Sequence, residues 1–535
     1  MLEWAGSLWQ AAGAVPGGQW ALVISVLSGL LYVAGTWTHG YFRSRGLPFS
    51  SPLPFLGNMA PLTFGSLSFN DYAEKMYYQF QDYSVFGIFQ FMTPVVFVRD
   101  PEIIKKLAVK DFDHFVDHQT LLTEKLDPLM AKNLFALRGQ EWRDMRATLS
   151  PAFTASKMRN IFKLVDQCGC QTVEFLKEEI RKSPLKVYEA DMKDFFTRFT
   201  NDVIATTAFG IQCDSLRDRR NAFYVMGRDL TNTKGLRTLL FLGYLLSPKL
   251  MEILNLPFIP PKVRDFFHGS VHETIRERQK QGIFRPDMLQ LLMQARAGQL
   301  KAEAGDEEEV VTGARKLQLT DTDITAQAVI FFFAGFDTVS TLMCFSALEL
   351  ARQPGVQQRL QRDVDAAVER SGGQLTYETV QDLKYLDMVL NEVLRLYPPV
   401  AFLNRKCVAD YTIEATGNLP SYTIKKEDIV WFAASALHRD PKYWSNPNVF
   451  DPERFSEENK ANIKPFTYMP FGVGPRLCIG SRFALMETKI ALAHILHHFS
   501  FVCTGKTPKV VKFAKRDFNA SVEGGFWLGI APRAK

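Results

Sequence analysis

A single cysteine near the C-terminus carries the most specific chemical signal in the sequence. Cys478 lies in the stretch FGVGPRLCIG, residues 471–480. An amphipathic pattern directly after it predicts a helix, so we expect the sulfur at a helix N-terminus, where the dipole and the free N–H groups favour a thiolate. Gly474 and Gly480 lack a Cβ and would let the backbone approach a flat ligand, while Arg476 adds a positive charge. A thiolate facing a planar, anionic cofactor suggests haem iron.

Taken alone, a cysteine is more often a small buried apolar side chain than a metal ligand. The whole pattern of Phe471, Gly474, Arg476, Cys478 and Gly480, however, resembles the haem-binding signature of the cytochrome P-450 superfamily. The resemblance implies that Cys478 ligates the iron of haem b and that the other four residues surround this cofactor.

A long apolar segment, residues 324–350, predicts a buried helix, and its polar residues argue against a second membrane span. The acid and alcohol at its centre, Asp337 and Thr338, are costly there unless they are used or satisfied. The plain alternative is that Thr338 bonds back to a helix carbonyl. The pair also resembles that of the superfamily, which implies that Thr338 hydrogen-bonds dioxygen at the haem and that Asp337 supplies protons for O–O cleavage. The same segment supplies three candidates for an apolar substrate wall, Phe331, Phe333 and Ala334.

Two further parts of the superfamily pattern supply partners for the haem propionates. A helix expected over residues 140–149 carries Trp142 and Arg146 at i, i+4, hence on one face, although an ordinary amphipathic pair would show the same spacing. The resemblance implies that Arg146 ion-pairs a propionate, that Trp142 donates its indole N–H, and that Arg405 contacts a propionate as well. His118 stands where related microsomal enzymes often carry a basic side chain, usually arginine, so its propionate contact is left open.

A helix expected over residues 385–397 ends at a diproline and places Glu392 and Arg395 at i, i+3. On a surface such a pair contributes less than about 1 kcal/mol. With Arg454 downstream, the pair resembles the buried triad of the superfamily, in which removing one partner costs about 3–5 kcal/mol. We therefore expect these three residues to be structural, and their loss to prevent haem incorporation.

The N-terminal region predicts a membrane anchor. An apolar run bracketed by Trp20 and Trp37 reaches, with its neighbours, the roughly 20 residues that cross a bilayer. Because basic residues follow this run rather than precede it, an uncleaved anchor is favoured over a cleaved signal peptide, with the body cytoplasmic. We predict a short non-cytoplasmic N-terminus (1–19), a single-pass anchor (20–37), a basic, proline-rich linker (38–60) and one haem-binding monooxygenase domain (61–535) at the endoplasmic reticulum membrane.

Composition bounds the remaining choices. The chain has 535 residues, of which 47% are hydrophobic, enough for a large core. A net charge of +6 is too weak for a nucleic-acid footprint but suits an acidic partner or an anionic lipid surface. Seven cysteines in so long a chain do not form a disulfide framework, which indicates a reducing compartment.

Long helical patterns with a minority of strands, such as residues 84–98, indicate a mainly α protein with a small β-rich lobe. The motifs follow the superfamily's order along nearly the whole chain, and the local sequence is most similar to arthropod microsomal detoxification-type members. The resemblance implies a single-domain P-450 fold.

The resemblance also implies an activity, the insertion of one oxygen atom from O2 into an apolar small molecule, either a xenobiotic or an endogenous lipid or hormone. Electrons would come from NADPH through NADPH–cytochrome P-450 reductase, with cytochrome b5 as a further candidate partner. Two alternatives stay open: a haem-thiolate isomerase or synthase acting on hydroperoxides, and a non-catalytic haem carrier or sensor.

Overall fold

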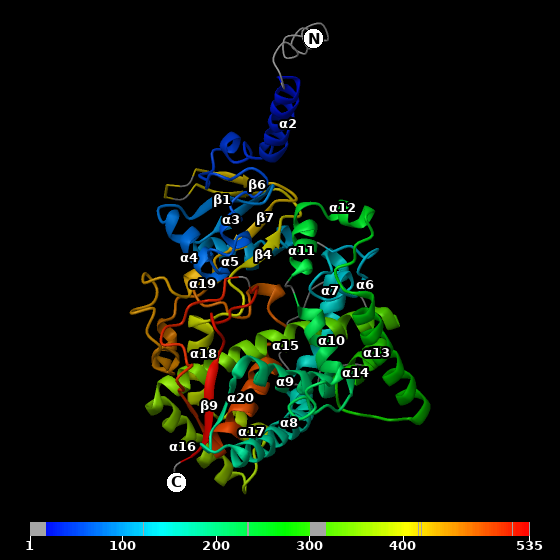
Figure 1. Ribbon diagram of the computed structural model, residues 1–535, viewed down its shortest axis with the longest axis vertical. Coiled ribbons are helices and arrows are strands. Elements are labelled where there is room, and N and C mark those ends of the chain that lie inside the picture. Colours follow the sequence, from blue (N-terminus) through cyan, green and yellow to red (C-terminus); the bar gives the residue numbers. More distant parts are fainter. Residues whose placement is uncertain are drawn as a thin grey trace.

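The computed structural model describes residues 18–120, 122–232, 235–299, 317–415, 417–418, 420–515 and 517–533. Helices dominate these residues, and a four-stranded sheet lies toward the end of the molecule that carries the N-terminal helix (Figure 1). The predicted class, mainly α with a small β-rich lobe, is confirmed. Of the predicted N-terminal segment 1–19, residues 1–17 lie outside the described part of the chain.

The helices follow in chain order as α2 (Gly18–Thr36), α3 (Ala60–Thr63), α4 (Phe69–Gln79), α5 (Pro101–Lys105), α6 (Pro128–Ala131), α7 (Gly139–Leu149), α8 (Ala155–Lys182), α9 (Met192–Ile204), α10 (Ala222–Thr231), α11 (Leu236–Leu246), α12 (Pro248–Ile253), α13 (Pro261–Gln281), α14 (Met288–Arg296), α15 (Asp321–Arg352), α16 (Pro354–Arg370), α17 (Tyr377–Gln381), α18 (Lys384–Leu396), α19 (Ala434–Leu437) and α20 (Ser481–His498). The helices predicted over 140–149 and 385–397 are α7 and α18. The one predicted over 324–350 is α15, which extends beyond both predicted ends.

The four-stranded sheet has the order β1 (Val85–Gln90), β2 (Thr93–Val98), β7 (Ile429–Phe432) and β4 (Leu403–Lys406). The antiparallel pair β1–β2 is the alternating segment predicted at 84–98. β2 also pairs in parallel with β7, which comes from the distant C-terminal part of the chain. A second sheet has the order β3 (Tyr188–Asp191), β9 (Trp527–Pro532) and β8 (Phe499–Val502), and β5 (Tyr411–Ile413) pairs with β6 (Tyr422–Ile424).

The helical body is organised around α15. Thr320 caps its start in a capping box with Asp323. α15 is apolar enough to span a membrane, but 61% of its apolar window is buried within the protein, so it is a core helix. It packs most extensively on α9, where a Cβ at Gly335 would lie 2.9 Å from Ile204.

The polar side chains that interrupt α15 have protein partners. Gln327 accepts from the N–H of Leu134 and donates to the carbonyl of Lys132, each at 2.9 Å. The carboxylate of Glu349 accepts from the hydroxyl of Tyr397 at 2.8 Å. These bonds offset the cost of burying polar groups, so the helix can remain in the core.

α2 projects from the β-rich end of the molecule (Figure 1), and 6% of its apolar window is buried. The residues that follow it pack on the sheet. Phe42 is fully buried, and a Cβ at Gly87 would lie 2.5 Å from its ring. The N–H of Ser50 donates to the carbonyl of Gly87, and the N–H of Gly87 to the carbonyl of Pro48. Part of the predicted linker 38–60 therefore lies along strand β1.

Candidate active site

Cys478 lies in the loop that leads into α20. Its N–H donates to the carbonyl of Phe471 at 2.9 Å, and α20 begins at Ser481, so Cys478 precedes the helix. The sequence led us to expect a thiolate favoured by the helix terminus. The side chain of Cys478 remains accessible, yet the protein around it displaces much of its hydration and raises the pKa of the thiol. The N–H of Gly480 and the charge of Arg146 oppose this shift without overcoming it. Ionisation of this thiol therefore calls for an added positive charge, such as a metal ion.

The two glycines of the cysteine loop have different surroundings. Gly474 has a φ of +66°, and a Cβ there would lie 2.0 Å from the carbonyl oxygen of Ala108. Glycine is therefore required at position 474 because the loop packs closely on the backbone of Ala108. A Cβ at Gly480 would meet nothing within 4 Å. The space beside Gly480 is open to a ligand.

Arg476 ties the cysteine loop to the segment before α7. Its buried guanidinium donates to the carbonyls of Val116 and Leu137, each at 2.8 Å, and its Nη2 lies 3.8 Å from Asp117 Oδ1. The guanidinium carbon lies 4.0 Å from the centroid of the Trp142 ring. Arg146, one turn after Trp142 on α7, donates from Nη1 to the carbonyl of Leu477 at 2.9 Å.

Arg405, on β4, is buried with an incomplete set of partners. It is 1% exposed and donates to the carbonyls of Asn404 at 2.8 Å and Val473 at 3.0 Å. Within the described ranges, its buried Nε has no hydrogen-bond partner and its guanidinium forms no ion pair with a carboxylate. Burial lowers its pKa to about 10. A buried cation in this state calls for an anion from outside the chain.

Trp142 and His118 lie at the same cluster. The Trp142 side chain is 1% exposed, and its indole N–H has no hydrogen-bond partner among the residues that the structure describes. Burial and the charges of Arg405 and Arg476 hold the pKa of His118 well below its usual value. Neutral His118 donates from Nδ1 to the carbonyl of Asn404 at 3.0 Å, which leaves Nε2 without a proton.

The cluster as a whole fits the predicted cofactor. Burial and the charges of Arg405 and Arg146 together lower the pKa of Arg476 to about 8, against the opposing effect of Asp117. Three buried arginines, Arg146, Arg405 and Arg476, thus lie in or against the Cys478 loop. A planar ligand with carboxylates, as haem b is, would supply the missing negative charge.

On α15, the predicted acid and alcohol are both engaged by protein groups. Thr338 Oγ1 donates to the carbonyl of Ala334 at 2.5 Å, which is the back-bonded state of a helix threonine. Asp337 forms an ion pair of 2.8 Å with Lys193 of α9 and accepts a hydrogen bond from Asn519 Nδ2. Asp337 is therefore held on the α9 side of α15.

Lys193 is a residue of this site that the sequence analysis missed. Besides the Asp337 carboxylate, its ammonium group donates to the Asp337 carbonyl at 3.0 Å and to the hydroxyls of Ser340 and Thr341 at 3.0 and 2.8 Å. α9, α15 and the C-terminal segment with Asn519 converge only in space. No local spacing in the sequence could have found this contact.

The aromatic run of α15 points in several directions. Phe332 is fully buried and stacks on Phe336, with ring centroids 4.9 Å apart. Phe331 is half-buried, with its ring centroid 5.4 Å from that of Phe153 in an edge-to-face contact, and Phe333 is half-buried on the core. Ala334 is exposed although most of α15 around it is buried. The three predicted lining residues thus retain accessible surface, and Phe332 does not.

The triad predicted from Glu392, Arg395 and Arg454 is assembled. Arg395 Nε and Nη2 donate to the two carboxylate oxygens of Glu392 at 2.7 and 2.8 Å, and both side chains are 0% exposed. Arg454 Nε lies 3.4 Å from Glu392 Oε1, which also accepts from the N–H of Asp451 at 2.9 Å. Arg395 donates further to the carbonyls of His438 and Pro447.

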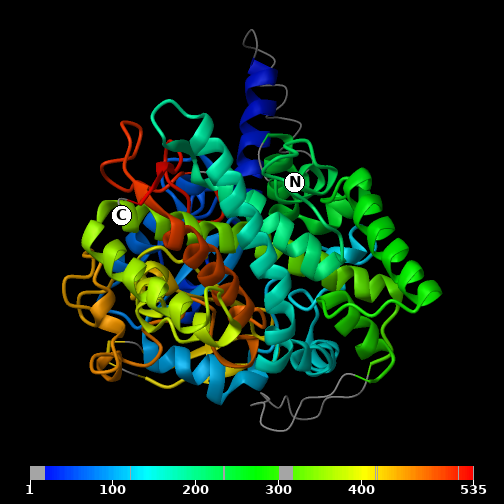
Figure 2. The ribbon, with the colours of Figure 1, turned by 90° about the horizontal axis from the view of Figure 1, so that it is seen from below.

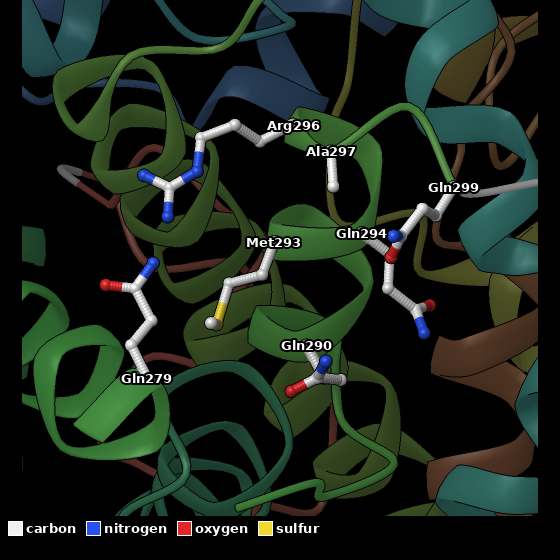
Figure 3. A pocket seen from close by; sticks show the side chains of 7 residues that line it. All are labelled: Gln279, Gln290, Met293, Gln294, Arg296, Ala297 and Gln299. Carbon is white, nitrogen blue, oxygen red and sulfur yellow. The ribbon is translucent and has the colours of Figure 1, made fainter. Parts of the chain in front are cut away.

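A polar hollow of about 270 Å³ lies elsewhere, between α13 and α14 (Figure 3). It is lined by Gln279, Gln290, Met293, Gln294, Arg296, Ala297 and Gln299. None of these residues belongs to the cysteine loop or to the acid–alcohol pair, and Arg296 is already paired with Asp321. This hollow is separate from the candidate site.

The cysteine loop and the buried arginines around it fit the class of a haem protein with a cysteine ligand, because Arg405 meets no carboxylate in the described part of the chain. Comparison with known families leads to one of them: the model described as Cytochrome P450 matches residues 47–520, and the chain belongs to this family. It is therefore a haem monooxygenase, and membership implies cysteine-thiolate ligation of the iron.

The similar proteins are insect enzymes. The chain is 51% identical over 525 residues to Cytochrome P450 9e2 of Blattella germanica, covering 96% of this chain and 98% of the relative. It is 40% identical over 519 residues to Probable cytochrome P450 9f2 of Drosophila melanogaster, with the same coverage. It is 36% identical over 501 residues to Cytochrome P450 6j1 of Blattella germanica, covering 94% and 95%. The predicted likeness to arthropod members is confirmed.

Proposed function

We propose that this chain is a membrane-anchored monooxygenase of the endoplasmic reticulum in which Cys478 is the haem ligand and the substrate binds beside α15. The observation that carries the proposal is Arg405, a buried guanidinium whose described surroundings include no paired carboxylate. It donates to Val473, at the start of the cysteine loop. The carboxylate of an anionic cofactor at Cys478 would supply the ion-pair partner that Arg405 lacks.

The residues around the cysteine loop would hold the cofactor. When bound, the haem supplies the redox and oxygen chemistry. Arg405 and Arg146 would hold its carboxylates, with Trp142 donating its indole N–H. Arg476 and the glycine turn at Gly474 keep the cysteine loop against the segment before α7.

The α15 side would handle protons. The Thr338 hydroxyl donates to Ala334 at rest, and a change of acceptor would let it donate toward the substrate space. Asp337 would relay protons when its contact with Lys193 opens, since a carboxylate held by an ammonium group is a poor base.

Apolar small molecules are the proposed substrates, whether xenobiotics or endogenous lipids or hormones. Phe331, Phe333 and Ala334 would line their site from α15. The exposed apolar helix α2 would place the enzyme at a bilayer, where such molecules collect. Electrons would come from NADPH through its P-450 reductase, which the mildly basic chain suits as an acidic partner, with cytochrome b5 as a second candidate donor.

The optical spectrum of the reduced, CO-bound protein tests the iron ligand. Wild type should give the red-shifted Soret band of a thiolate-ligated haem, and Cys478→Ala should lose it. Cys503→Ser, which removes another exposed cysteine, is the matched control and should keep the band. Retention of the band in Cys478→Ala would refute the assignment.

Reconstitution with the reductase tests the reaction. Wild type should form an oxygenated product at the expense of NADPH and O2. Thr338→Ala should continue to oxidise NADPH while peroxide replaces product. Turnover of a hydroperoxide by wild type without reductase or NADPH, and no NADPH-dependent product, would favour the isomerase alternative.

A further inference from the structure

Outside the candidate haem site, three metal-ligating side chains meet where α8 packs on α20. Asp166 and Cys170 lie at i, i+4 on α8, and His494 comes from α20. The two helices run side by side (Figures 1 and 2). The Cys170 Sγ, a carboxylate oxygen of Asp166 and a ring nitrogen of His494 all lie within 4.8 Å of one another.

The position of His494 is built into both helices. Its Nε2 lies 2.7 Å from Asp166 Oδ1. A Cβ at Gly169 would lie 2.3 Å from His494 Cδ2, so glycine at this position makes room for the ring against the backbone of α8. The imidazole is therefore held by packing as well as by its hydrogen bond. Orientation of a ligand by its surroundings is a property of metal sites.

The charges around Cys170 favour a cation. The carboxylates of Asp166 and Glu174 place negative charge beside the Cys170 thiol. The same carboxylates that disfavour a bare thiolate would attract a metal ion. Cys170 is exposed, so an ion can reach the cluster from solvent.

We propose that Cys170, His494 and Asp166 form a site for a zinc-like divalent cation, with water as the fourth ligand. Thiolate, imidazole and carboxylate together suit Zn²⁺, whereas Mg²⁺ and Ca²⁺ prefer oxygen ligands alone. Zn²⁺ takes these ligands tetrahedrally at about 2.0–2.3 Å, which places ligand atoms about 3.5 Å apart. The 2.7 Å between His494 Nε2 and Asp166 Oδ1 must therefore widen, and the Cys170 Sγ must approach by up to about 1 Å through rotation of its exposed side chain. Binding releases the thiol proton of Cys170 to solvent. The proton that His494 Nε2 shares with Asp166 moves by exchange with solvent to Nδ1, so that Nε2 and the Asp166 carboxylate each bind the metal.

Such an ion would clamp α20 to α8. α20 starts just after the loop that holds Cys478, and His494 lies in its last turns. A metal that binds the folded form and not the unfolded chain raises the unfolding temperature. The clamp would therefore stabilise the helix that follows the proposed haem ligand.

The test uses the haem-loaded full chain with zinc chloride. Zinc content after gel filtration, measured by atomic emission, and the thermal midpoint would be compared for wild type, Cys170→Ser and the matched control Cys503→Ser. Wild type and the control should retain about one zinc per chain and show a higher midpoint with zinc. Cys170→Ser should bind zinc at least about tenfold more weakly, and magnesium should raise the midpoint in none of them.

A second measurement on wild type avoids any folding defect of the variant. Zinc should protect Cys170, and not Cys503, from alkylation by iodoacetamide, as read by peptide mass spectrometry. Equal zinc affinity in wild type and Cys170→Ser would overturn the proposal. So would equal alkylation of Cys170 with and without zinc, since the cluster would then be an ordinary histidine–aspartate pair beside a thiol.

Discussion

Two buried arginines, Arg395 on α18 and Arg405 on β4, differ in their hydrogen-bond and ion-pair partners, and this difference distinguishes a structural arginine from one that would bind a ligand. Both are essentially inaccessible to solvent. Arg395 meets both oxygens of the Glu392 carboxylate and several carbonyls, so its charge is compensated within the chain. Arg405 meets two carbonyls, and its Nε has no partner in the described part of the chain. Burial alone does not distinguish the two residues, but the missing carboxylate does.

The contrast extends to their surroundings. The Glu392 network is closed, because both oxygens of its carboxylate accept from Arg395 and Oε1 also meets Arg454 and the N–H of Asp451. Around Arg405, the neighbouring guanidinium of Arg476 repels further positive charge, and both arginines hold the pKa of His118 well below its usual value. One region is complete as folded, and the other is completed by an anion that the chain does not provide.

Breaking the closed network should have the largest effect. Glu392→Ala leaves Arg395 buried without its carboxylate and should cost about 3–5 kcal/mol of unfolding free energy, with loss of haem incorporation. Chemical denaturation and the yield of haem-loaded protein measure both. Glu453→Ala is the control, because it breaks a nearby pair with Arg359 that is half exposed and contributes less than about 1 kcal/mol. Equal stability of the two variants would contradict the closed-network interpretation.

Arg405→Met should weaken haem binding without the loss of stability expected for Glu392→Ala. Removing an uncompensated buried cation should leave the haem-free chain as stable as wild type or more so. Haem binding should weaken by about 1.5–3 kcal/mol, or roughly 10- to 100-fold, because a charged hydrogen bond to the cofactor is lost. Haem titration measures the loss of affinity, and denaturation of the haem-free chain measures its stability. Unchanged haem affinity would remove Arg405 from the site.

The ion pair of Lys193 and Asp337 is half-buried, so it is less enclosed than the pair of Arg395 and Glu392. Lys193→Met should lower stability by only about 1 kcal/mol, since the pair is partly open to solvent. It should also change the solvent deuterium isotope effect on product formation, because Asp337 loses its ammonium partner. Lys506→Met, which breaks an exposed pair with Glu189, is the control and should leave the isotope effect unchanged.

Asp202 offers the most pH-specific effect. Burial raises its pKa to about 6, although it accepts hydrogen bonds from the N–H and hydroxyl of Ser215. Because the folded form then binds a proton more readily than the unfolded chain, stability should rise as the pH falls from about 7 toward 4. Asp202→Asn should flatten this slope in urea unfolding series, and an unchanged slope would exclude Asp202 as its source.

Local spacing was sufficient for much of the site. The pairs Trp142–Arg146 and Glu392–Arg395 follow from helix periodicity, and the assembled helices α7 and α18 confirm their shared faces. The apolar length of α15 predicted its burial, and the alternation at 84–98 predicted β1 and β2. These features depend on residues within a few turns of each other, so the sequence carries them directly.

What the sequence by itself determined is the chemistry of the site: a cysteine in a glycine-punctuated loop, cations spaced along helix and strand, and an acid–alcohol pair in a buried helix. The tertiary structure alone decided which of these groups are already satisfied. Desolvation raises the pKa of Cys478 against the local helix effect, and Lys193 reaches Asp337 from another helix. Burial and long-range pairing depend on segments that meet only after folding, so no local pattern encodes them.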